Sequence, residues 1–535
     1  MLKEESQNNI AGEDYINSTE AENKIEPTYD DKNAYTAEVY DDGGRSSDLD
    51  YNKKWYDKLL ASWLPLYSNS MVQIVILSFV VFMTPGMYNA LTGIGASGIK
   101  PSVADNANVA LYSTFAGIGF FGGYICNLIG INICLVFGGI GYLIYSASLL
   151  CYTKTENAGF VIFAGAFMGL CASCLWAAQG TIIMSYPTED KKGRAVLTFW
   201  IIFNLGAVIG SLIALANNLE NGSSNLSDST FIAFIVLMGC GSIIALFMLP
   251  PNKVRKSDGT RVLLKKYPNW KTEFILLWNV LRSEKMLWLL FPCFFSSNWF
   301  YTYQFNEFNA GRFTIRTRSL NSLLYWSSQM LGATFIGLIL DLKYFRRRIR
   351  ARIGWAILFV FAMVIWGGGY KFQSGFTRKD VTAASKGEKP KLSPIDYKDG
   401  AYIGPMFLYM FYGVMDSMFQ SYMLWLLGSM SNNYNKTSLY AGFYKGLQSA
   451  GAAVAFRLDS DSILIPYMNM FASCWALTCG SLLVGLPTVW LRVTDHTEAE
   501  EDYTQNPGEF IDIRPEKSRK SIEPYEVVGV SNQGV

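Results

Sequence analysis

The chain has 535 residues, of which 50% are hydrophobic and only 16% are charged, and its formal net charge is +2. Soluble proteins carry about 25% charged residues, so this composition, with a mean hydropathy of +0.18, indicates an integral membrane protein. The basic residues lie in short loops between apolar runs, which argues against nucleic acid as a partner and leaves the lipid bilayer as the expected surrounding.

The two ends of the chain are polar. Residues 1–68 are acidic and lack an apolar run near Met1, so we expect a disordered tail and no cleavable signal peptide. Residues 492–535 are also acidic, and we expect a second disordered tail there.

Twelve apolar runs between the tails are each long enough to cross a bilayer about 30 Å thick. The expected spans are 70–92, 108–129, 132–151, 159–185, 195–216 and 231–249 in a first half (69–249), then 286–308, 319–340, 353–370, 401–428, 437–456 and 468–491 in a second half (286–491). A connector, 250–285, joins the halves, and the stretch 267–288 mixes aromatic and basic residues as an amphipathic helix on a membrane surface would. The expected fold is therefore an all-α membrane protein with twelve transmembrane helices in two six-helix halves.

The charged island 188–194 separates two of the apolar runs. Because Lys and Arg favour the cytoplasmic side, we expect this island, the connector and the basic run 343–352 to lie in the cytoplasm, together with both termini. The sequence does not distinguish the plasma membrane from an endomembrane such as that of the vacuole or the endoplasmic reticulum.

The loop after the eighth span reads GLILDLKYFRRRIRAR and begins at Gly337. A small residue, then a carboxylate, then a basic cluster resembles the signature loop of the major facilitator superfamily. A carboxylate at a helix end can pair with the basic turn or with the dipole of a neighbouring helix, and so hold one conformation. We therefore expect a gating role for Gly337, Asp341, Lys343, Arg346 and Arg347. A plain cytoplasmic basic loop is the alternative, and it explains the arginines but not the spacing from Gly337 to Asp341.

The corresponding loop of the first half, GGYICNLIGIN, is an incomplete copy of that motif. Asn127 stands where the aspartate belongs, and the basic residues are absent. A fuller copy in one half and an eroded copy in the other are typical of repeated halves.

Longer stretches resemble one family within that superfamily. LWAAQGTIIMSYPTEDKKGR, followed by FWIIFNLGAVIG, resembles the signature of the Unc-ninety-three-like family, also called ion channel regulatory proteins. MYNALTGIGASG and ALYSTFAGIGFFGGYICNLIG resemble its fungal branch. The resemblance covers about 70–495 and implies a major-facilitator fold. It implies no particular substrate, because some relatives are described as channel regulators or receptor chaperones and others only as transporter-like.

Pairs of glycines four residues apart allow membrane helices to approach closely. Such pairs are Gly119/Gly123, Gly165/Gly169, Gly206/Gly210 and Gly442/Gly446. In the fold that the resemblance implies, spans 2, 5, 8 and 11 form the seam between the halves, so we expect some of these pairs to let the halves rock. Ordinary helix packing is the alternative.

Ionisable and polar residues inside the spans are the best indication of a site. Asp416 lies near the middle of the tenth span, and Tyr409, Tyr412 and Gln420 share its helical face. In the fold that the resemblance implies, spans 1, 4, 7 and 10 line a central cavity. The further cavity candidates are Asn89, Gln179, Asn298, Tyr301, Gln304 and Glu307.

Lys445 in the eleventh span lies within about 5 Å of the depth of Asp416, at 1.5 Å per helical residue. A buried Asp416–Lys445 pair would neutralise two charges that are costly in hydrocarbon. The pair could bind a coupling proton or ion, or it could serve only to neutralise polar packing, and the sequence leaves both interpretations open.

The leading functional hypothesis is a secondary transporter that moves an unknown small solute by alternating access. The alternative is a non-transporting regulator or escort of another membrane protein, such as an ion channel. An enzyme is not expected, because no arrangement of nucleophile and base occurs. The single histidine, His496, lies in the tail, and the nine cysteines lie in or beside apolar runs, so we expect no metal and no cofactor.

The orientation leads to a prediction about glycans. Asn221 and Asn225 are acceptors in a loop that should be exoplasmic, so we expect glycans on one or both, whereas Asn17 and Asn435 should face the cytoplasm and stay unmodified. Replacing Asn221 and Asn225 by Gln should remove the whole shift in gel mobility that a glycosidase produces. A tag at Val535 that a protease can reach from outside intact cells would contradict this topology.

Overall fold

A computed structural model describes residues 56, 65–95, 99–119, 121–188, 191–218, 226–256, 259, 262, 270–342, 344–382, 390–431 and 434–495. The chain forms two units, residues 1–53 and residues 54–535, and only the second contains described residues. Most of both predicted tails, the acceptors Asn221 and Asn225, and the loop residue Lys343 lie outside the described residues.

The first half consists of helices joined by short turns. In chain order they are α1 (Ser70–Val81), η2 (Phe82–Gly86), α2 (Met87–Gly93), α3 (Pro101–Gly119), α4 (Gly122–Ile129), α5 (Ile131–Thr155), α6 (Ala158–Ser185), α7 (Lys192–Asn218) and α8 (Asp228–Leu246). Pro85 lies inside η2, a π-helical turn, and proline cannot donate the regular helical hydrogen bond. The first predicted span is therefore one helix interrupted at a proline, and the second is interrupted at Phe121, between α3 and α4.

The connector and the second half follow the same scheme. Their elements are η5 (Pro251–Lys253), α9 (Trp270–Ser283), α10 (Lys285–Leu289), α11 (Phe291–Ser296), η6 (Thr302–Ala310), α12 (Ile315–Asp341), α13 (Arg347–Gln373), α14 (Arg378–Val381), η7 (Gly400–Tyr402), α15 (Ile403–Met430), α16 (Tyr434–Asp459) and α17 (Tyr467–Leu491). η6 is a nine-residue π-helix, a rare form that often marks functional sites, and all of it except Ala310 is buried.

The predicted all-α class is confirmed for the described residues, which form no strand beyond two isolated bridges. Eight segments of the described chain are long and apolar enough to cross a membrane on composition alone, and they match predicted spans 1, 3, 4, 5, 6, 8, 9 and 12. The other four spans are formed by α3 with α4, by α10 to η6, by α15 and by α16. These four carry buried polar residues such as Asp105, Glu307 and Asp416, which lower their hydropathy without exposing polar groups to lipid.

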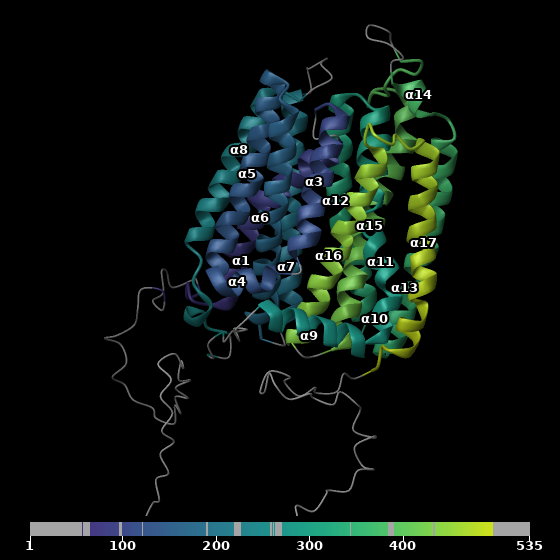
Figure 1. Ribbon diagram of the computed structural model, residues 1–535. Coiled ribbons are helices and arrows are strands. Elements are labelled where there is room, and N and C mark those ends of the chain that lie inside the picture. The colour runs from purple at the N-terminus through teal and green to yellow at the C-terminus, as the bar shows by residue number, and fades with distance from the viewer. Residues whose placement is uncertain are drawn as a thin grey trace, which may run out of the picture. The chain divides into compact units, whose positions relative to one another are not determined.

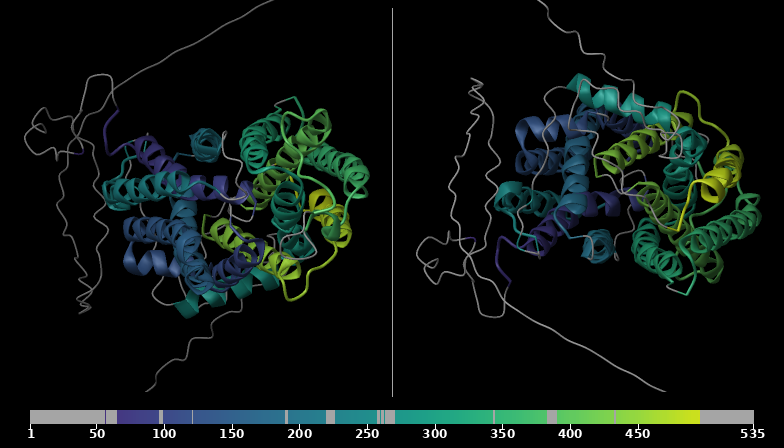
Figure 2. Two further views of the ribbon diagram at one scale, coloured as in Figure 1. Left: turned by 90° about the horizontal axis from the view of Figure 1, so that it is seen from above. Right: turned by 90° about the horizontal axis from the view of Figure 1, so that it is seen from below.

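The two halves lie side by side, purple to blue for the first and teal through green to yellow for the second (Figure 1). They meet along two seams, α3 against α16 and α7 against α12. α9 lies across one end of the bundle, roughly perpendicular to the spans, and α14 lies at the opposite end (Figures 1 and 2). We call these the α9 end and the α14 end. On α9, Leu277 and Leu281 are buried while Ile275 and Trp278 are exposed, and its placement on a membrane surface stays a prediction.

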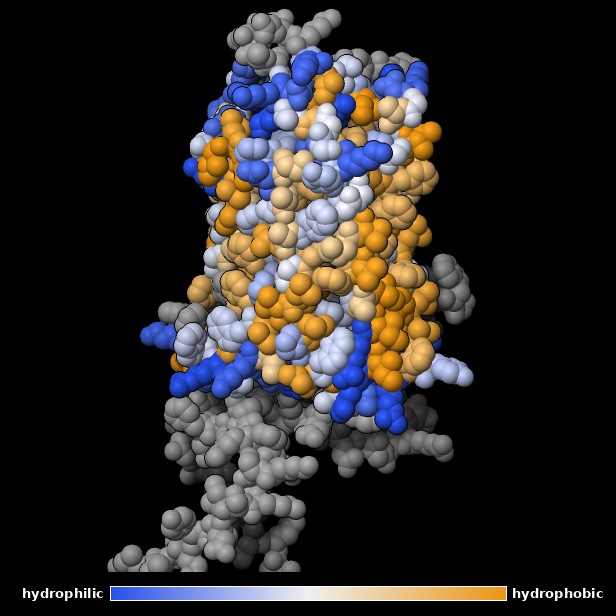
Figure 3. Space-filling view, turned by 90° about the vertical axis from the view of Figure 1, so that its right-hand side faces the viewer, coloured by the Kyte–Doolittle hydropathy of each residue, from blue (hydrophilic) through white to orange (hydrophobic). Residues whose placement is uncertain are grey.

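The outer surface is that of a membrane protein. Hydrophobic side chains form a broad belt between two hydrophilic ends on the face shown in Figure 3. Val364 on α13 and Leu483 on α17 are among the exposed apolar residues. Soluble proteins rarely expose apolar patches of this extent, so the belt is the surface that contacts lipid.

Hydrogen bonds between the halves gather at the α14 end. The main-chain carbonyl groups of residues 93–95, at the end of α2, accept them from the second half. Arg318 at the start of α12 donates to two of these oxygens, at 2.8 and 2.5 Å. Asn309 and Tyr409 both donate to the carbonyl oxygen of Gly93, at 2.8 and 3.2 Å. Hydrogen bonds from side chains of the second half to main-chain oxygens of the first half thus hold this end of the bundle closed.

The glycine pairs pack helices inside the first half rather than along the seam. A Cβ added at Gly169 on α6 would lie 2.2 Å from a main-chain oxygen of α3, and one at Gly206 on α7 would lie 2.4 Å from a main-chain oxygen of η2. A Cβ at Gly442 on α16 would meet nothing within 4 Å. The closest approach in the second half is instead at Gly451 on α16, where a Cβ would lie 1.8 Å from the carbonyl oxygen of Phe295.

This contact predicts a position-specific effect on stability. Gly451→Ala should lower the melting temperature, because the new methyl group would push α16 away from α11, and overpacking costs about 1–3 kcal/mol or more. Gly442→Ala on the same helix is the matched control and should be neutral or slightly stabilising, since Ala has the higher helix propensity. Thermal unfolding monitored with a thiol-reactive dye, which labels the buried cysteines as they become exposed, measures both variants. Equal melting temperatures would contradict the expected contact.

Candidate functional site

A buried carboxylate lies at the centre of the second half. Asp416 is in the middle of α15 and is 0% exposed. Its Oδ2 accepts hydrogen bonds from the hydroxyl groups of Tyr301 and Tyr325, at 3.0 Å each, and from Nε2 of Gln329 at 2.5 Å. Its Oδ1 accepts a bond from Nε2 of Gln420 at 2.7 Å. Four neutral donors thus satisfy the carboxylate where water is scarce.

Two glutamines connect this carboxylate to Lys445. Oε1 of Gln420 accepts a hydrogen bond from Nε2 of Gln448 at 3.0 Å, and Oε1 of Gln448 accepts one from Nζ of Lys445 at 2.8 Å. The same Nζ lies 5.6 Å from the ring centre of Trp176 on α6, in the first half. The chain Asp416–Gln420–Gln448–Lys445 therefore reaches from the second half to the first.

The direct Asp416–Lys445 ion pair expected from the sequence is not formed between these two described residues. A glutamine from each helix fills the space between α15 and α16 instead. The rise per residue gives the depth of a group along its helix, but it does not give the lateral distance between two helices. The similar depths of Asp416 and Lys445 along their helices were therefore insufficient to predict a contact between their side chains.

The interrupted seventh span supplies the next members of the network. α11 ends at Ser296, and the turn that follows carries two acceptors before η6 begins. Nε2 of Gln448 donates to Oγ of Ser297 at 2.9 Å and to Oδ1 of Asn298 at 2.8 Å. Tyr325 also lies 2.9 Å from Oε1 of Gln304 in η6. Breaks in membrane helices are tolerated where protein groups satisfy the backbone, and they commonly line binding sites.

Tyr409 and Tyr412 share the α15 face with Asp416 but lie closer to the α14 end. Their rings pack against Phe308, with centroids 5.4 and 5.7 Å away, and the ring of Tyr412 lies 4.9 Å from that of Trp366. These tyrosines form part of an aromatic core that separates Asp416 from the α14 end.

The other residues that the sequence predicted to line a cavity lie in different parts of the molecule. Glu307 lies at the α14 end, where it pairs with Arg378. Gln179 on α6 and Asn89 on α2 are half-buried, and neither side chain joins the hydrogen bonds of Asp416 among the described residues. The structure thus brings together Asp416, Gln420, Lys445, Asn298, Tyr301 and Gln304 from the predicted set.

Three members of the network were not among the sequence candidates. Tyr325 and Gln329 come from α12, and Gln448 comes from α16. Their helices were assigned to the seam between the halves and were not searched for site residues. The spacing of four between Tyr325 and Gln329, and of three between Lys445 and Gln448, is the signal that would have found them.

The predicted gating loop lies at the end of α12. Asp341 is exposed and forms no ion pair with Arg346 or Arg347 among the described residues. Arg347 donates to main-chain carbonyl groups near the ends of α17 and α15, at 2.6 and 3.4 Å. Gly337 is half-buried in α12, and Asn127 lies in α4. A latch through Asp341 stays a prediction about another conformation.

Comparisons with known proteins agree with this architecture. The sequence model of the Major Facilitator Superfamily matches residues 71–456. An UNC93-like protein of Schizosaccharomyces pombe is 52% identical over 437 residues, which cover 82% of this chain and 85% of that protein. UNC93-like protein 1 of Arabidopsis thaliana is 36% identical over 480 residues, which cover 89% of this chain and 98% of that protein.

A solved structure has a similar fold. The crystal structure of a D-xylose-proton symporter superposes with a TM-score of 0.53 at 12% sequence identity, covering 80% of this chain and 99% of that one. At this level of identity the likeness concerns the fold alone.

The donor set around Asp416 predicts unequal effects of two substitutions. Asp416→Leu should strongly destabilise the protein, because an unsatisfied buried donor costs about 1–3 kcal/mol and the change removes the acceptor of four. Asp416→Asn retains an acceptor oxygen and should lose much less. Met415→Leu, a buried volume-conserving change one residue away, is the control. The melting temperatures of the purified variants show the order of their stabilities.

The glutamine-mediated arrangement is tested by a double variant. Lys445→Met combined with Asp416→Leu should not recover the stability of the unmodified protein, because Gln420 and Gln448 still lack their partners. Full recovery in the double variant would show a direct pair and contradict this arrangement.

Proposed function

Because the chain belongs to the UNC93-like proteins of the Major Facilitator Superfamily, we propose that it is a secondary transporter that moves a small polar solute by alternating access, with Asp416 as the group that binds a coupling proton. The observation that carries this proposal is the fully buried carboxylate held by four neutral donors.

The partners of Asp416 suit both of its charge states. An ionised carboxylate accepts all four hydrogen bonds. After protonation one oxygen becomes a donor, and a rotated tyrosine hydroxyl or a flipped glutamine amide can accept from it. A group whose surroundings tolerate gain and loss of a proton is suited to coupling, whereas a permanent ion pair would resist the change.

The hydrogen-bonded chain provides a route from proton binding to movement of the halves. A change of charge at Asp416 alters the orientation preferred by Gln420 and Gln448, and through them the position of Lys445. The ammonium group of Lys445 lies over Trp176 of the other half. The contact between Lys445 and Trp176 has one arrangement when Asp416 is protonated and another when it is ionised. Because Asp416 binds the proton more tightly in one of them, proton binding shifts the protein towards that arrangement.

The site also limits the class of solute. The turn before η6 and the facing helices present amide and hydroxyl groups, including those of Asn298, Gln304 and Gln420, rather than a cluster of one charge. Neutral hydrogen-bonding solutes such as sugars, polyols, nucleosides and zwitterionic amino acids can exchange hydrogen bonds with groups of this kind. We propose that the α9 end faces the cytoplasm, since the basic loops lie at that end.

Transport and coupling are tested separately in proteoliposomes. A panel of these solute classes is first screened by the melting temperature of the purified protein, and a solute that raises it is then used in radiolabelled form. Asp416→Asn should retain exchange of solute across the membrane but lose accumulation driven by an imposed pH gradient by about tenfold or more. Asp461→Asn, which changes an exposed carboxylate, should behave like the unmodified protein.

Two outcomes contradict the proposal in different ways. If no solute is bound or exchanged while the protein remains folded, transport is wrong and a regulatory role is favoured. If exchange occurs and Asp416→Asn still accumulates solute in response to the pH gradient, transport stands and the assignment of the coupling group is wrong.

A further inference from the structure

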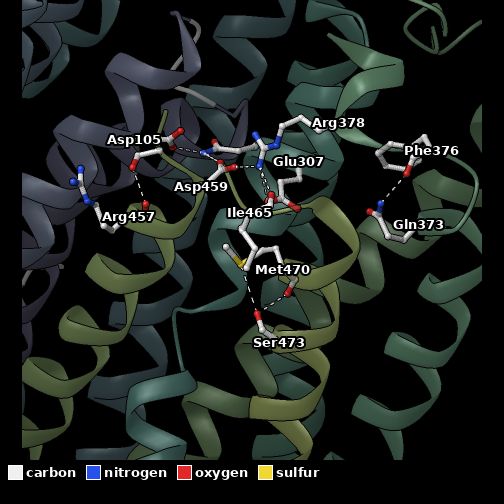
Figure 4. A network of polar contacts seen from close by, with 12 residues as sticks. Asp105, Glu307, Gln373, Phe376, Arg378, Arg457, Asp459, Ile465, Met470 and Ser473 are labelled. Atoms are coloured by element: carbon white, nitrogen blue, oxygen red, sulfur yellow. Dashed lines mark hydrogen bonds and ion pairs between the residues drawn. The ribbon is translucent and has the colours of Figure 1, made fainter. Parts of the chain in front are cut away.

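A second polar cluster joins the two halves at the α14 end (Figure 4). Nη2 of Arg378 donates to Asp459 at 2.5 Å and lies 3.4 Å from Oε1 of Glu307. Nδ2 of Asn306 donates to Oδ1 of Asp105 at 2.6 Å and lies 3.3 Å from Oδ2 of Asp459. Asp105 belongs to α3 in the first half, whereas the other four residues belong to the second half.

The charges in this cluster do not balance. Asp105, Glu307 and Asp459 are 2%, 0% and 3% exposed, and among the described residues Arg378 forms ion pairs with Glu307 and Asp459 but not with Asp105. If all three acids were ionised, a net negative charge would be buried without compensation, which is strongly unfavourable. Among the described residues, the other titratable groups facing the cluster include Asp461, Tyr303, Tyr467 and Cys474, none of which carries a positive charge. The exposed Arg457 lies beside the cluster and forms no ion pair with these acids.

Two local features show where a proton would reside. The carboxyl groups of Glu307 and Asp459 converge on one nitrogen, Nη2 of Arg378, which lies 3.4 Å from Oε1 of Glu307 and 2.5 Å from Oδ1 of Asp459, so one guanidinium group serves two acids. Oε2 of Glu307 is buried and has no hydrogen-bond partner. Asp459 is the last residue of α16, where the helix dipole disfavours a negative charge.

We propose that Glu307, Asp459 and Asp105 form a second proton-binding site, separate from Asp416, and that a proton retained there keeps the two halves closed at the α14 end. With the proton bound, Asn306 and Arg378 hold the acids of both halves together. When the proton leaves, Asp105 of the first half faces ionised acids of the second half, and their repulsion favours separation.

The sign of the pH effect follows from this arrangement. Closure should be complete at acidic pH and should be lost as pH rises. If closing retains one proton, the ratio of closed to open molecules falls about tenfold for each pH unit above the transition. On the predicted topology the α14 end is exoplasmic, so the site would respond to the pH outside the cytoplasm.

Distances between spin labels across the α14 end test this proposal without a solute. Labels are attached to cysteines introduced at Glu156 in the first half and at Lys398 in the second, both exposed, after the accessible Cys151 and Cys240 are replaced by Ser. Electron–electron distance distributions are recorded from pH 5.5 to 9.5. The short-distance population should dominate at acidic pH and fall as the pH rises.

Replacing the acids by amides shows whether these carboxyl groups retain the proton. Glu307→Gln and Asp459→Asn each mimic a protonated acid, so either should keep the short distance up to pH 9.5. Having both variants guards against the failure of one to fold. Asp461→Asn, two residues from Asp459 and exposed, removes a neighbouring charge but none of the three proposed proton acceptors, so it should displace the pH-dependent transition at most and not abolish it.

Three results would overturn the proposal. In the first, the distance distribution of the unmodified protein does not change with pH. In the second, both amide variants fold and show the same pH-dependent transition as the unmodified protein. In the third, the short-distance population at constant pH increases with sodium chloride but not with choline chloride. The last would assign the site to a metal cation. Because none of these measurements depends on Asp416 or on a solute, failure here is distinct from failure of the transport proposal.

Discussion

A carboxylate in a membrane interior must find its hydrogen-bond donors within the protein, and the packing of the second half follows from how Asp416 does so. Its donors come from the turn after α11, from α12 and from α15 itself, and Gln420 extends the contacts to α16. Four spans are thereby fixed relative to one buried group. The cluster at the α14 end shows the opposite case, because Glu307, Asp459 and Asp105 have too few donors for three charges.

The fold could be predicted from the sequence because helices in lipid must satisfy their backbones internally, and apolar runs of sufficient length reveal them. The boundaries were less accurate where one face of a helix is polar. The second span was expected to begin at residue 108, but α3 begins at Pro101, a residue well suited to the first position of a helix. Hydropathy averages over all faces of a helix, so the buried Asp105 and Asn108 concealed its first turns.

The centre of the candidate site was predicted because an ionisable residue in a membrane span is rare and therefore conspicuous. Asp416, Gln420 and Lys445 were found in this way, but Gln448, which links Gln420 to Lys445, was not. The cluster at the α14 end escaped prediction for a different reason. Asp105 and Asp459 are far apart in the sequence and Arg378 lies in the short helix α14 between two predicted spans, so no spacing along the chain links them.

Where the end of α2 meets the second half, the two halves contribute different kinds of hydrogen-bonding group. There the first half contributes the main-chain oxygens of residues 93–95, while side chains of the second half contribute the donors. Side chains are excluded there: a Cβ at Gly95, whose φ is +83°, would lie 2.0 Å from the carbonyl oxygen of Phe305, and one at Gly93 would lie 2.5 Å from Oγ of Ser322. Evolution therefore constrains the two halves differently at this contact. The first half must keep Gly93 and Gly95, whereas the second half must keep the side chains that donate to them. At the contacts of residues 93–95, drift in sequence can therefore change the strength of the closure through the side chains of the second half.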